Sequence, residues 1–170
     1  MKKALLIALA TLFVANFAYS ADYVGLYADP DHNLCTLPGG SFTMYVLGWM
    51  SDHSMSGIEF RIVLPTIATL GQPVMGPDVS YPSGTITYDY SVLFNGCHMG
   101  WWEILHVPVT LTPGIGVIRV EKGMDADLLK IIDCVWDEYE IFVANHMYIG
   151  EPCITIGTQD ATWGAIKSLF

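Results

Sequence analysis

The stretch SGIEFRIVLP (residues 56–65) decides the fold class of this chain. Ile58, Phe60 and Ile62 fall on one face of an extended backbone, and the charged residues between them fall on the other. Alternation with a period of two, bounded by Gly and Pro, is typical of a strand with one face in a core and one in water. We therefore expect an all-β protein whose other strands cover this apolar face.

Similar short alternating runs, rich in β-branched and aromatic residues, recur along the chain. Their spacing, with turn signals between them, predicts a single antiparallel β-sandwich of about eight or nine strands. The ten candidate segments from which these strands would come lie at residues 23–27, 41–49, 58–63, 85–94, 101–111, 115–121, 129–135, 139–144, 147–149 and 154–156.

The segments between these runs carry turn signals. Residues 51–56 are polar and predict a short connection, and Asn95-Gly96 is a strong turn signal. Residues 65–83 contain four prolines and two glycines, which indicates an irregular excursion with at most a brief pairing near 66–70. We also expect one helical turn within 124–129.

The ends of the chain differ from the middle. Residues 1–20 have two lysines, an apolar run and small residues before Ala21, which predicts a secretory signal peptide cleaved after Ser20. The apolar run is shorter than the roughly 20 residues of a membrane-spanning helix. We therefore divide the chain into a signal peptide (1–20), a β-sandwich domain (21–157) and a C-terminal tail with a short helix (158–170).

The charge of the chain excludes some partners. Without the signal peptide, the chain has five Lys and Arg residues and seventeen Asp and Glu residues, so its formal net charge is −12. Such a protein repels nucleic acids and anionic lipids, and we expect neither as a partner. The acidic surface is compatible with cation binding or with solubility outside the cell.

The four cysteines are Cys35, Cys97, Cys134 and Cys153. An even number in an exported chain predicts two disulfides, and three pairings are open. Among these we favour Cys97–Cys134 with Cys35–Cys153. No two cysteines have the C-x₂₋₄-C spacing of a zinc site.

Three segments carry a resemblance to known proteins. They are VGLYAD (24–29), GIEFR (57–61) and the closing WGAIKSLF (163–170). The chain resembles a group of exported bacterial proteins, mostly of unassigned function, that end in a W-G-x-I-K-x-L-aromatic tail. Their cores are similar to cohesin or immunoglobulin-type β-sandwiches. The resemblance implies that fold and an extracytoplasmic location, in the periplasm, at the cell surface or outside the cell, and it implies no catalytic residues.

A weak calcium motif precedes Cys35. Asp29, Asp31 and Asn33 have the D-x-D-x-N spacing of the first three ligands of a calcium loop. The sixth position is Leu34 where Gly is needed, and the twelfth is Gly40 where a bidentate Glu belongs. The alternative is a polar turn without a metal, so no cofactor is expected apart from this candidate calcium.

Catalytic motifs are missing from the sequence. It contains no H-E-x-x-H pair and no G-x-S-x-G elbow. Glu138 and Glu140 alternate on one strand face, which is typical of a solvated surface rather than of the opposed carboxylates of a glycosidase. We therefore expect a protein that is not an enzyme.

The aromatic residues offer a candidate binding site. Trp101 and Trp102 are adjacent, so one points into the core and the other outward. An outward Trp near Tyr81 or Trp49 could stack on a sugar ring or contact a partner protein. The alternative is that one Trp lies in the core and residues 65–83 cover the other.

These observations lead to two functional hypotheses. The first is a secreted, non-enzymatic structural or adhesive module that binds a partner at a bacterial cell surface or in the extracellular space. The second is a carbohydrate-binding module that uses exposed Trp and Tyr, with calcium assistance. A hydrolase is a third class, and no motif supports it.

Overall fold

The computed structural model describes residues 22–37 and 40–150, and this part of the chain is all-β, as expected, without any helix. None of it could therefore cross a membrane as a helix. Residues 124–129 form bends where we expected a helical turn. The strands are β1 (Tyr23–Tyr27), β2 (Thr36–Leu37), β3 (Ser41–Val63), β4 (Ala68–Leu70), β5 (Val74–Met75), β6 (Val79–Thr85), β7 (Asp89–Leu111), β8 (Gly116–Glu121), β9 (Lys130–Asp133), β10 (Glu138–Glu140), β11 (Phe142–Asn145) and β12 (Met147–Ile149).

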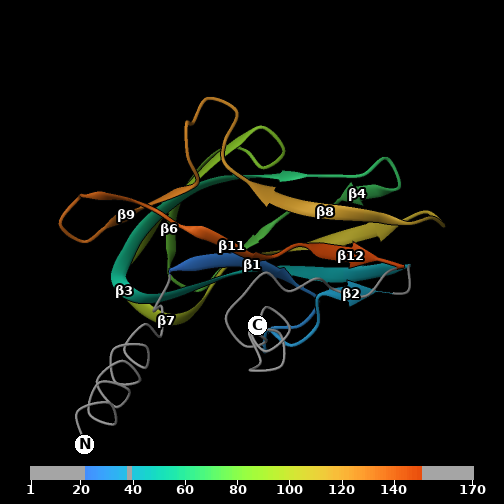
Figure 1. The fold of residues 1–170 in the computed structure, drawn as a ribbon, viewed down its shortest axis with the longest axis horizontal. Coiled ribbons are helices and arrows are strands. Elements are labelled where there is room, and N and C mark those ends of the chain that lie inside the picture. The colour runs from blue at the N-terminus through green and yellow to red at the C-terminus, as the bar shows by residue number, and fades with distance from the viewer. Residues whose placement is uncertain (1–21, 38–39, 151–170) are drawn as a thin grey trace, which may run out of the picture.

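Two long strands, β3 and β7, organise the fold. They pair with each other from Ser41↔Thr110 to Phe60↔Tyr90. The first half of β3 also pairs with β1, and its second half pairs with β9 and β8. Figure 1 shows β3 curving around one end of the molecule from one layer to the other. In the described part of the chain, a single hydrogen-bonded sheet of twelve strands thus curls strongly and places its two halves face to face.

Two of the expected chain breaks are wrong. Residues 51–56 lie inside β3, and Asn95-Gly96 lies inside β7. The register passes from Met50↔Gly100 to Met55↔His98, so β3 advances five residues while β7 advances two. The turn-forming residues therefore mark a bulged bend that both strands share. The four expected strands on either side of these segments merge into two.

Other boundaries also differ from the expectation. The run 85–94 is broken at 86–88, where Tyr88 N donates to Thr85 O (2.9 Å) and separates β6 from β7. Within 65–83, the brief pairing expected near 66–70 is present as β4, but this segment is not otherwise irregular, because it also contains β5 and most of β6, and all three strands pair with β7. As an edge strand, β6 tolerates Pro82. Residues 22–37 and 40–150 contain twelve strands where the whole domain was expected to have eight or nine, and β1–β11 and β2–β12 are parallel pairs.

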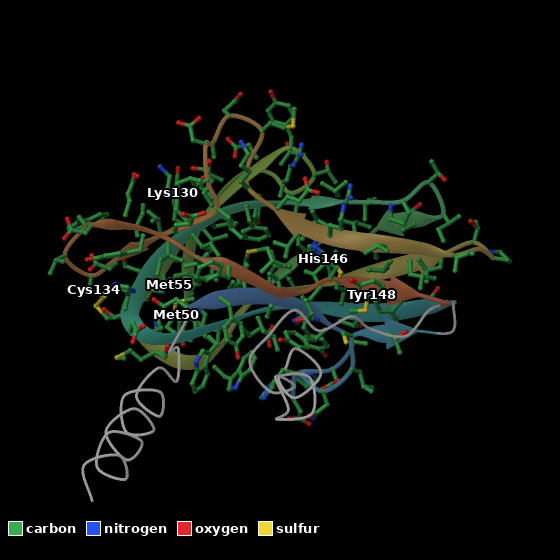
Figure 2. The ribbon with its side chains drawn as sticks, in the orientation of Figure 1. Met50, Met55, Lys130, Cys134, His146 and Tyr148 are labelled. Carbon is green, nitrogen blue, oxygen red and sulfur yellow. A yellow bond between two sulfur atoms is a disulfide. The ribbon has the colours of Figure 1, made fainter. Side chains whose placement is uncertain are left out.

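The core lies between the two halves of the curled sheet. Ile58, Phe60 and Ile62 are at most 2 % exposed, which confirms the face predicted from their alternation. Figure 2 labels Met50 and Met55 at the bend of β3, and both side chains are fully buried. The unbranched thioether side chain suits the irregular space inside such a bend.

The predicted Cys97–Cys134 disulfide is present and joins β7 to the turn after β9. Cys35 is buried, and its favoured partner Cys153 lies outside the described residues, so this pair stays a prediction. The signal peptide, the expected strand at 154–156 and the tail with its short helix also lie outside them.

Candidate functional site

Four aromatic residues form a row across one face of the sheet, each on a different strand. Phe142 of β11 lies opposite Tyr23 of β1, and Tyr23 lies opposite Trp49 of β3. Trp49 lies opposite Trp101 of β7. Neighbouring strands are about 4.8 Å apart, so this aromatic row spans roughly 14 Å.

Strand alternation places the aromatic row on the outer face of its layer. In β1, Val24 and Leu26 are fully buried, while Tyr23 is half-buried. Phe142 is 65 % exposed, whereas the next residue, Val143, packs against the core. The sequence therefore supplies one apolar layer for the interior and a second, aromatic layer for the surface.

Trp101 has ring contacts with four other side chains. The imidazole of His32 stacks on it with ring centroids 3.6 Å apart and an interplanar angle of 17°. Tyr23 and Tyr27 approach it edge-on, at 5.7 and 5.9 Å. A Cβ at Gly25 would lie 2.9 Å from Tyr27 Cε2, so the absence of a side chain there makes room for the Tyr27 ring.

The loop that carries His32 is closed by Asp29. One carboxylate oxygen of Asp29 accepts the amide N–H of Asn33 (3.2 Å), and the other accepts that of Leu34 (2.6 Å). His32 has a φ of 55°, in the left-handed region. The Asp29 carboxylate thus shapes the loop that holds His32 against Trp101.

The same loop contains the candidate calcium ligands. Asp31 and Asn33 are exposed, and Asp29 already bonds two backbone amides. Within residues 22–37 and 40–150, no three His, Cys, Asp or Glu side chains gather in a metal-binding group. Calcium binding at this loop stays a prediction.

Tyr23 of the row and the neighbouring Tyr27 keep their protons at neutral pH. Burial raises the pKa of the Tyr27 phenol, and the nearby Tyr23 and Asp29 raise it further. Burial also raises the pKa of Tyr23. The surface is therefore apolar with neutral hydroxyl groups.

The structure separates the four aromatic residues that the sequence singled out. Trp49 and Trp101 are neighbours, with ring centroids 5.5 Å apart. Trp102 faces the other way, stacks on His98 (3.3 Å) and packs against the core. Tyr81 lies on β6 opposite Leu93, away from the row. Adjacent Trp residues thus point to opposite sides, as alternation requires.

Sequence reasoning missed two members of the row, Tyr23 and Phe142. The alternation in YVGLY (23–27) signals an outward Tyr23. Phe142 joins the row through the parallel pairing of β1 with β11, which are more than a hundred residues apart. No local pattern predicts that pairing.

Glu59 of β3 and Asp89 of β7 form a pair of partly buried acids. Burial raises the pKa of Glu59, and the charge of Asp89 and a hydrogen bond to it raise this pKa further. The two carboxyl groups of a glycosidase are separated by about 5–9.5 Å to admit the sugar or a water. Glu59 and Asp89 are in direct contact instead, so this pair does not have that geometry.

Comparisons with known proteins bear on the fold. No family model and no curated protein matches the chain. Among solved structures, a non-cellulosomal cohesin from the hyperthermophilic archaeon Archaeoglobus fulgidus matches with a TM-score of 0.54 and 11% identity, over 86% of this chain and 98% of that chain. This match confirms the cohesin-like β-sandwich fold.

Two bacterial cohesins give lower scores. The seventh ScaB type I cohesin from Pseudobacteroides cellulosolvens has a TM-score of 0.48 and 13% identity, over 82% of this chain and 97% of that one. The third ScaB cohesin of R. flavefaciens, solved in complex with a group 1 dockerin, has a TM-score of 0.47 and 12% identity, over 79% and 99%.

Proposed function

We propose that this protein is a secreted, non-enzymatic binding module with a structural or adhesive role, and that it binds a partner protein through the aromatic row. The observation that carries the proposal is the outward row of Phe142, Tyr23, Trp49 and Trp101 on a cohesin-like sandwich. Aromatic residues are enriched at the centres of protein interfaces, where their burial provides much of the binding energy.

The proposed location outside the cell rests on the sequence and on the cysteines. Residues 1–20 have the composition of a signal peptide, and the Cys97–Cys134 disulfide suits an oxidising compartment. The W-G-x-I-K-x-L-aromatic tail, through its resemblance to exported bacterial proteins, supports the same location. A bacterial cell surface or the extracellular space fits these features.

Carbohydrate binding is the alternative, because Trp49 and Trp101 are neighbours on one outer face. Two observations weigh against it. A sugar stacks on the flat face of a ring, and His32 already lies against Trp101. The Trp49 and Trp101 rings are also tilted by 52°, so they do not form one flat platform.

The test measures binding of the fluorescently labelled exported protein to producing cells and to the material that they shed. We expect protease treatment of the cells to abolish binding, and periodate treatment or EDTA to leave it unchanged. The double variant Trp49→Ala/Phe142→Ala should bind at least tenfold more weakly. Tyr88→Ala, which removes a 51 % exposed aromatic outside the row, is the matched control.

Each other outcome assigns a different function. Binding lost after periodate but kept after protease identifies a carbohydrate ligand, and loss in EDTA adds calcium to the site. If the labelled protein binds neither the cells nor their shed material, the adhesive role is wrong.

A further inference from the structure

The turn between β9 and β10 holds two large apolar side chains in solvent. Val135 is 71 % exposed and Trp136 is 73 % exposed. No other large hydrophobic residue in the described part of the chain is as exposed as Trp136. We refer to residues 134–137 as the hairpin tip.

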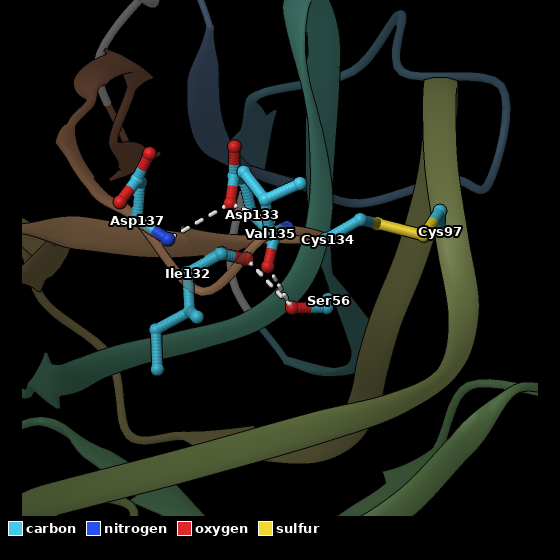
Figure 3. The surroundings of a disulfide bond; sticks show 7 residues. All are labelled: Ser56, Cys97, Ile132, Asp133, Cys134, Val135 and Asp137. Atoms are coloured by element: carbon cyan, nitrogen blue, oxygen red, sulfur yellow. Dashed lines mark hydrogen bonds between the residues drawn. A yellow bond between two sulfur atoms is a disulfide. The ribbon is translucent and has the colours of Figure 1, made fainter.

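A buried carboxylate fixes the backbone of the hairpin tip. Asp133 is only 8 % exposed, and its Oδ1 accepts the amide N–H groups of Val135 (2.8 Å) and Asp137 (2.9 Å). The amide of Trp136 donates to the Asp133 carbonyl (3.2 Å). Figure 3 shows Val135 and Asp137 beside Asp133, and a dashed line marks the hydrogen bond from the Asp137 amide to the Asp133 carboxylate. The turn therefore has a defined shape although its side chains are exposed.

Two further contacts attach the hairpin tip to the long strands. The disulfide joins Cys134 to Cys97 of β7. On the β3 side, Ser56 Oγ donates to the carbonyls of Ile132 (3.0 Å) and Asp133 (2.6 Å). The tip is thus held by both strands that organise the sandwich (Figure 3).

Trp136 occupies a backbone conformation that suits glycine or asparagine. Its φ is 70°, in the left-handed region where a bulky side chain is strained. A large residue held in such a conformation while exposed to solvent contributes nothing to the core. Strain of this kind persists where the surroundings enforce it, and it concentrates at functional positions.

The surroundings of Trp136 are acidic. Asp137 and Glu138 follow it directly, and Glu140 comes two positions later. β10 borders a pocket of about 270 Å³. The pocket is lined by Asp127, Leu128, Lys130, Glu138, Tyr139 and Glu140. Lys130 already pairs with Glu138 (2.6 Å). Three acids and one engaged lysine therefore leave the pocket with a net negative charge.

We propose that the hairpin tip and this pocket form a docking site for a protein segment that combines apolar and basic side chains. Trp136 and Val135 provide the apolar contact, and an arginine can also stack on the indole ring. A lysine or arginine of the partner enters the pocket beside Glu138 and Glu140. Charge complementarity selects this occupant, because a second copy of the acidic tip or an anionic membrane would be repelled.

The experiment uses three synthetic peptides of equal length as probes, and surface plasmon resonance on the immobilised exported protein. One peptide alternates Leu with Arg, one alternates Ser with Arg, and one alternates Leu with Glu. We expect the Leu–Arg peptide to bind at least tenfold more tightly than the other two. Trp136→Ala should weaken its binding at least tenfold, and Glu138→Gln/Glu140→Gln should weaken it severalfold and reduce its dependence on salt.

Two controls separate this site from the rest of the molecule. Tyr88→Ala should leave peptide binding unchanged, and so should Trp49→Ala/Phe142→Ala, because the aromatic row is a different surface. The urea midpoint of each variant is measured first to confirm folding. Since the row and the tip are tested by different variants, either proposal can fail while the other holds.

Several outcomes would overturn the proposal. Equal binding of the Leu–Arg peptide by Trp136→Ala and by the wild-type protein would show that Trp136 does not contact the peptide. Equal binding of the Leu–Glu peptide removes the charge argument. The wild-type protein could instead bind no peptide but form a dimer that Trp136→Ala abolishes, which would assign the tip to self-association. If it adsorbs to phosphatidylcholine vesicles and Trp136→Ala abolishes this adsorption, the tip would be assigned to a lipid surface.

Discussion

The carboxylate of Asp22 lies 2.5 Å from Nδ1 of His53, which is 31 positions away in the sequence. It also accepts the amide N–H groups of Ser51 (2.7 Å), Asp52 (3.0 Å) and His53 (3.2 Å). The side chain of Asp22 is 4 % exposed. A single buried carboxylate therefore binds the backbone where β3 bends between the two layers, and His53 stacks on Tyr139 beside it (3.7 Å).

Replacing Asp22 should destabilise this bend. Asp22→Ala leaves three partly buried amides without their acceptor, so we expect the free energy of unfolding to fall by about 2–4 kcal/mol. Asp22→Asn keeps an acceptor oxygen and should cost less. Urea denaturation of the two variants measures the difference, with the exposed Asp31→Ala as the control. An Asp22→Ala protein as stable as the control would contradict the role of this carboxylate.

Two glycines provide a matched test of packing. A Cβ at Gly25 would overlap Asn145 Oδ1 and lie 2.9 Å from the Tyr27 ring. At Gly48, which is also buried, the nearest side-chain atoms are 3.4 Å or more away. Gly25→Ala should therefore lower the free energy of unfolding by about 2–3 kcal/mol, and Gly48→Ala should leave it nearly unchanged. Equal thermal midpoints for the two variants would show that the Tyr27 ring is not constrained as described.

The Cys97–Cys134 disulfide closes a long loop, since the two cysteines have a sequence separation of 37. The chain-entropy model for a loop of this length gives a stabilisation of about 4 kcal/mol. The double variant Cys97→Ser/Cys134→Ser should lose an amount of this order in urea denaturation, and reducing agent should then have no further effect at this bond. A loss below about 1 kcal/mol would mean that the unfolded chain gains little freedom.

The Glu59–Asp89 pair predicts a pH dependence of stability. Burial and Asp89 raise the pKa of Glu59 in the folded protein, so the folded state binds its proton more tightly than the unfolded state does. The resulting stabilisation is present below the unfolded pKa of about 4.3 and is lost as the pH rises through the folded pKa. The free energy of unfolding of the Glu59→Gln variant, relative to that of the wild-type protein, should therefore be higher at pH 7 than at pH 4.

Thermal unfolding across this pH range measures the effect. Asp125→Asn, at an exposed position, is the control for a change of one formal charge. A Glu59→Gln difference that is the same at both pH values would show that the two carboxyl groups do not share a proton in the folded state.

Removing the indole ring from the hairpin tip should not destabilise the protein. Trp136→Gly relieves a left-handed conformation that costs roughly 1–2 kcal/mol, and it adds roughly 0.5–1 kcal/mol of backbone entropy to the unfolded state. The free energy of unfolding should rise by about 0–1 kcal/mol. The same variant should lose binding of the Leu–Arg peptide, and a large drop in stability would instead make Trp136 a structural residue.

The sequence was sufficient to predict the all-β class and the buried face of β3. The alternation of Ile58, Phe60 and Ile62 correctly predicted which side of β3 is buried. It could not predict that β3 and β7 run on through Ser51–Ser56 and Asn95-Gly96, because those residues are also the ones that form turns. These residues form a bend within a strand, and not a turn that ends it, because the Asp22 carboxylate binds the backbone of β3 there and β7 bends at the same place.

The candidate site was predicted only where it depends on local alternation. The opposite directions of Trp101 and Trp102 follow from strand geometry, and Cys97–Cys134 belongs to the one pairing, of three open ones, that we favoured. Phe142 and Tyr23 join the row through pairing between distant strands. The exposure of Trp136 depends on Asp133, whose carboxylate could equally have faced water. Long-range pairing and side-chain burial, rather than composition, decide these positions.

β3 and β7 each run through both layers and pair with each other in both. One layer therefore cannot separate from the other unless these two strands break. The two halves of the molecule therefore form one cooperative unit, in which local opening beyond the edge strands requires global unfolding. A ligand held at the aromatic row should slow amide exchange in the core of the opposite layer as much as in its own.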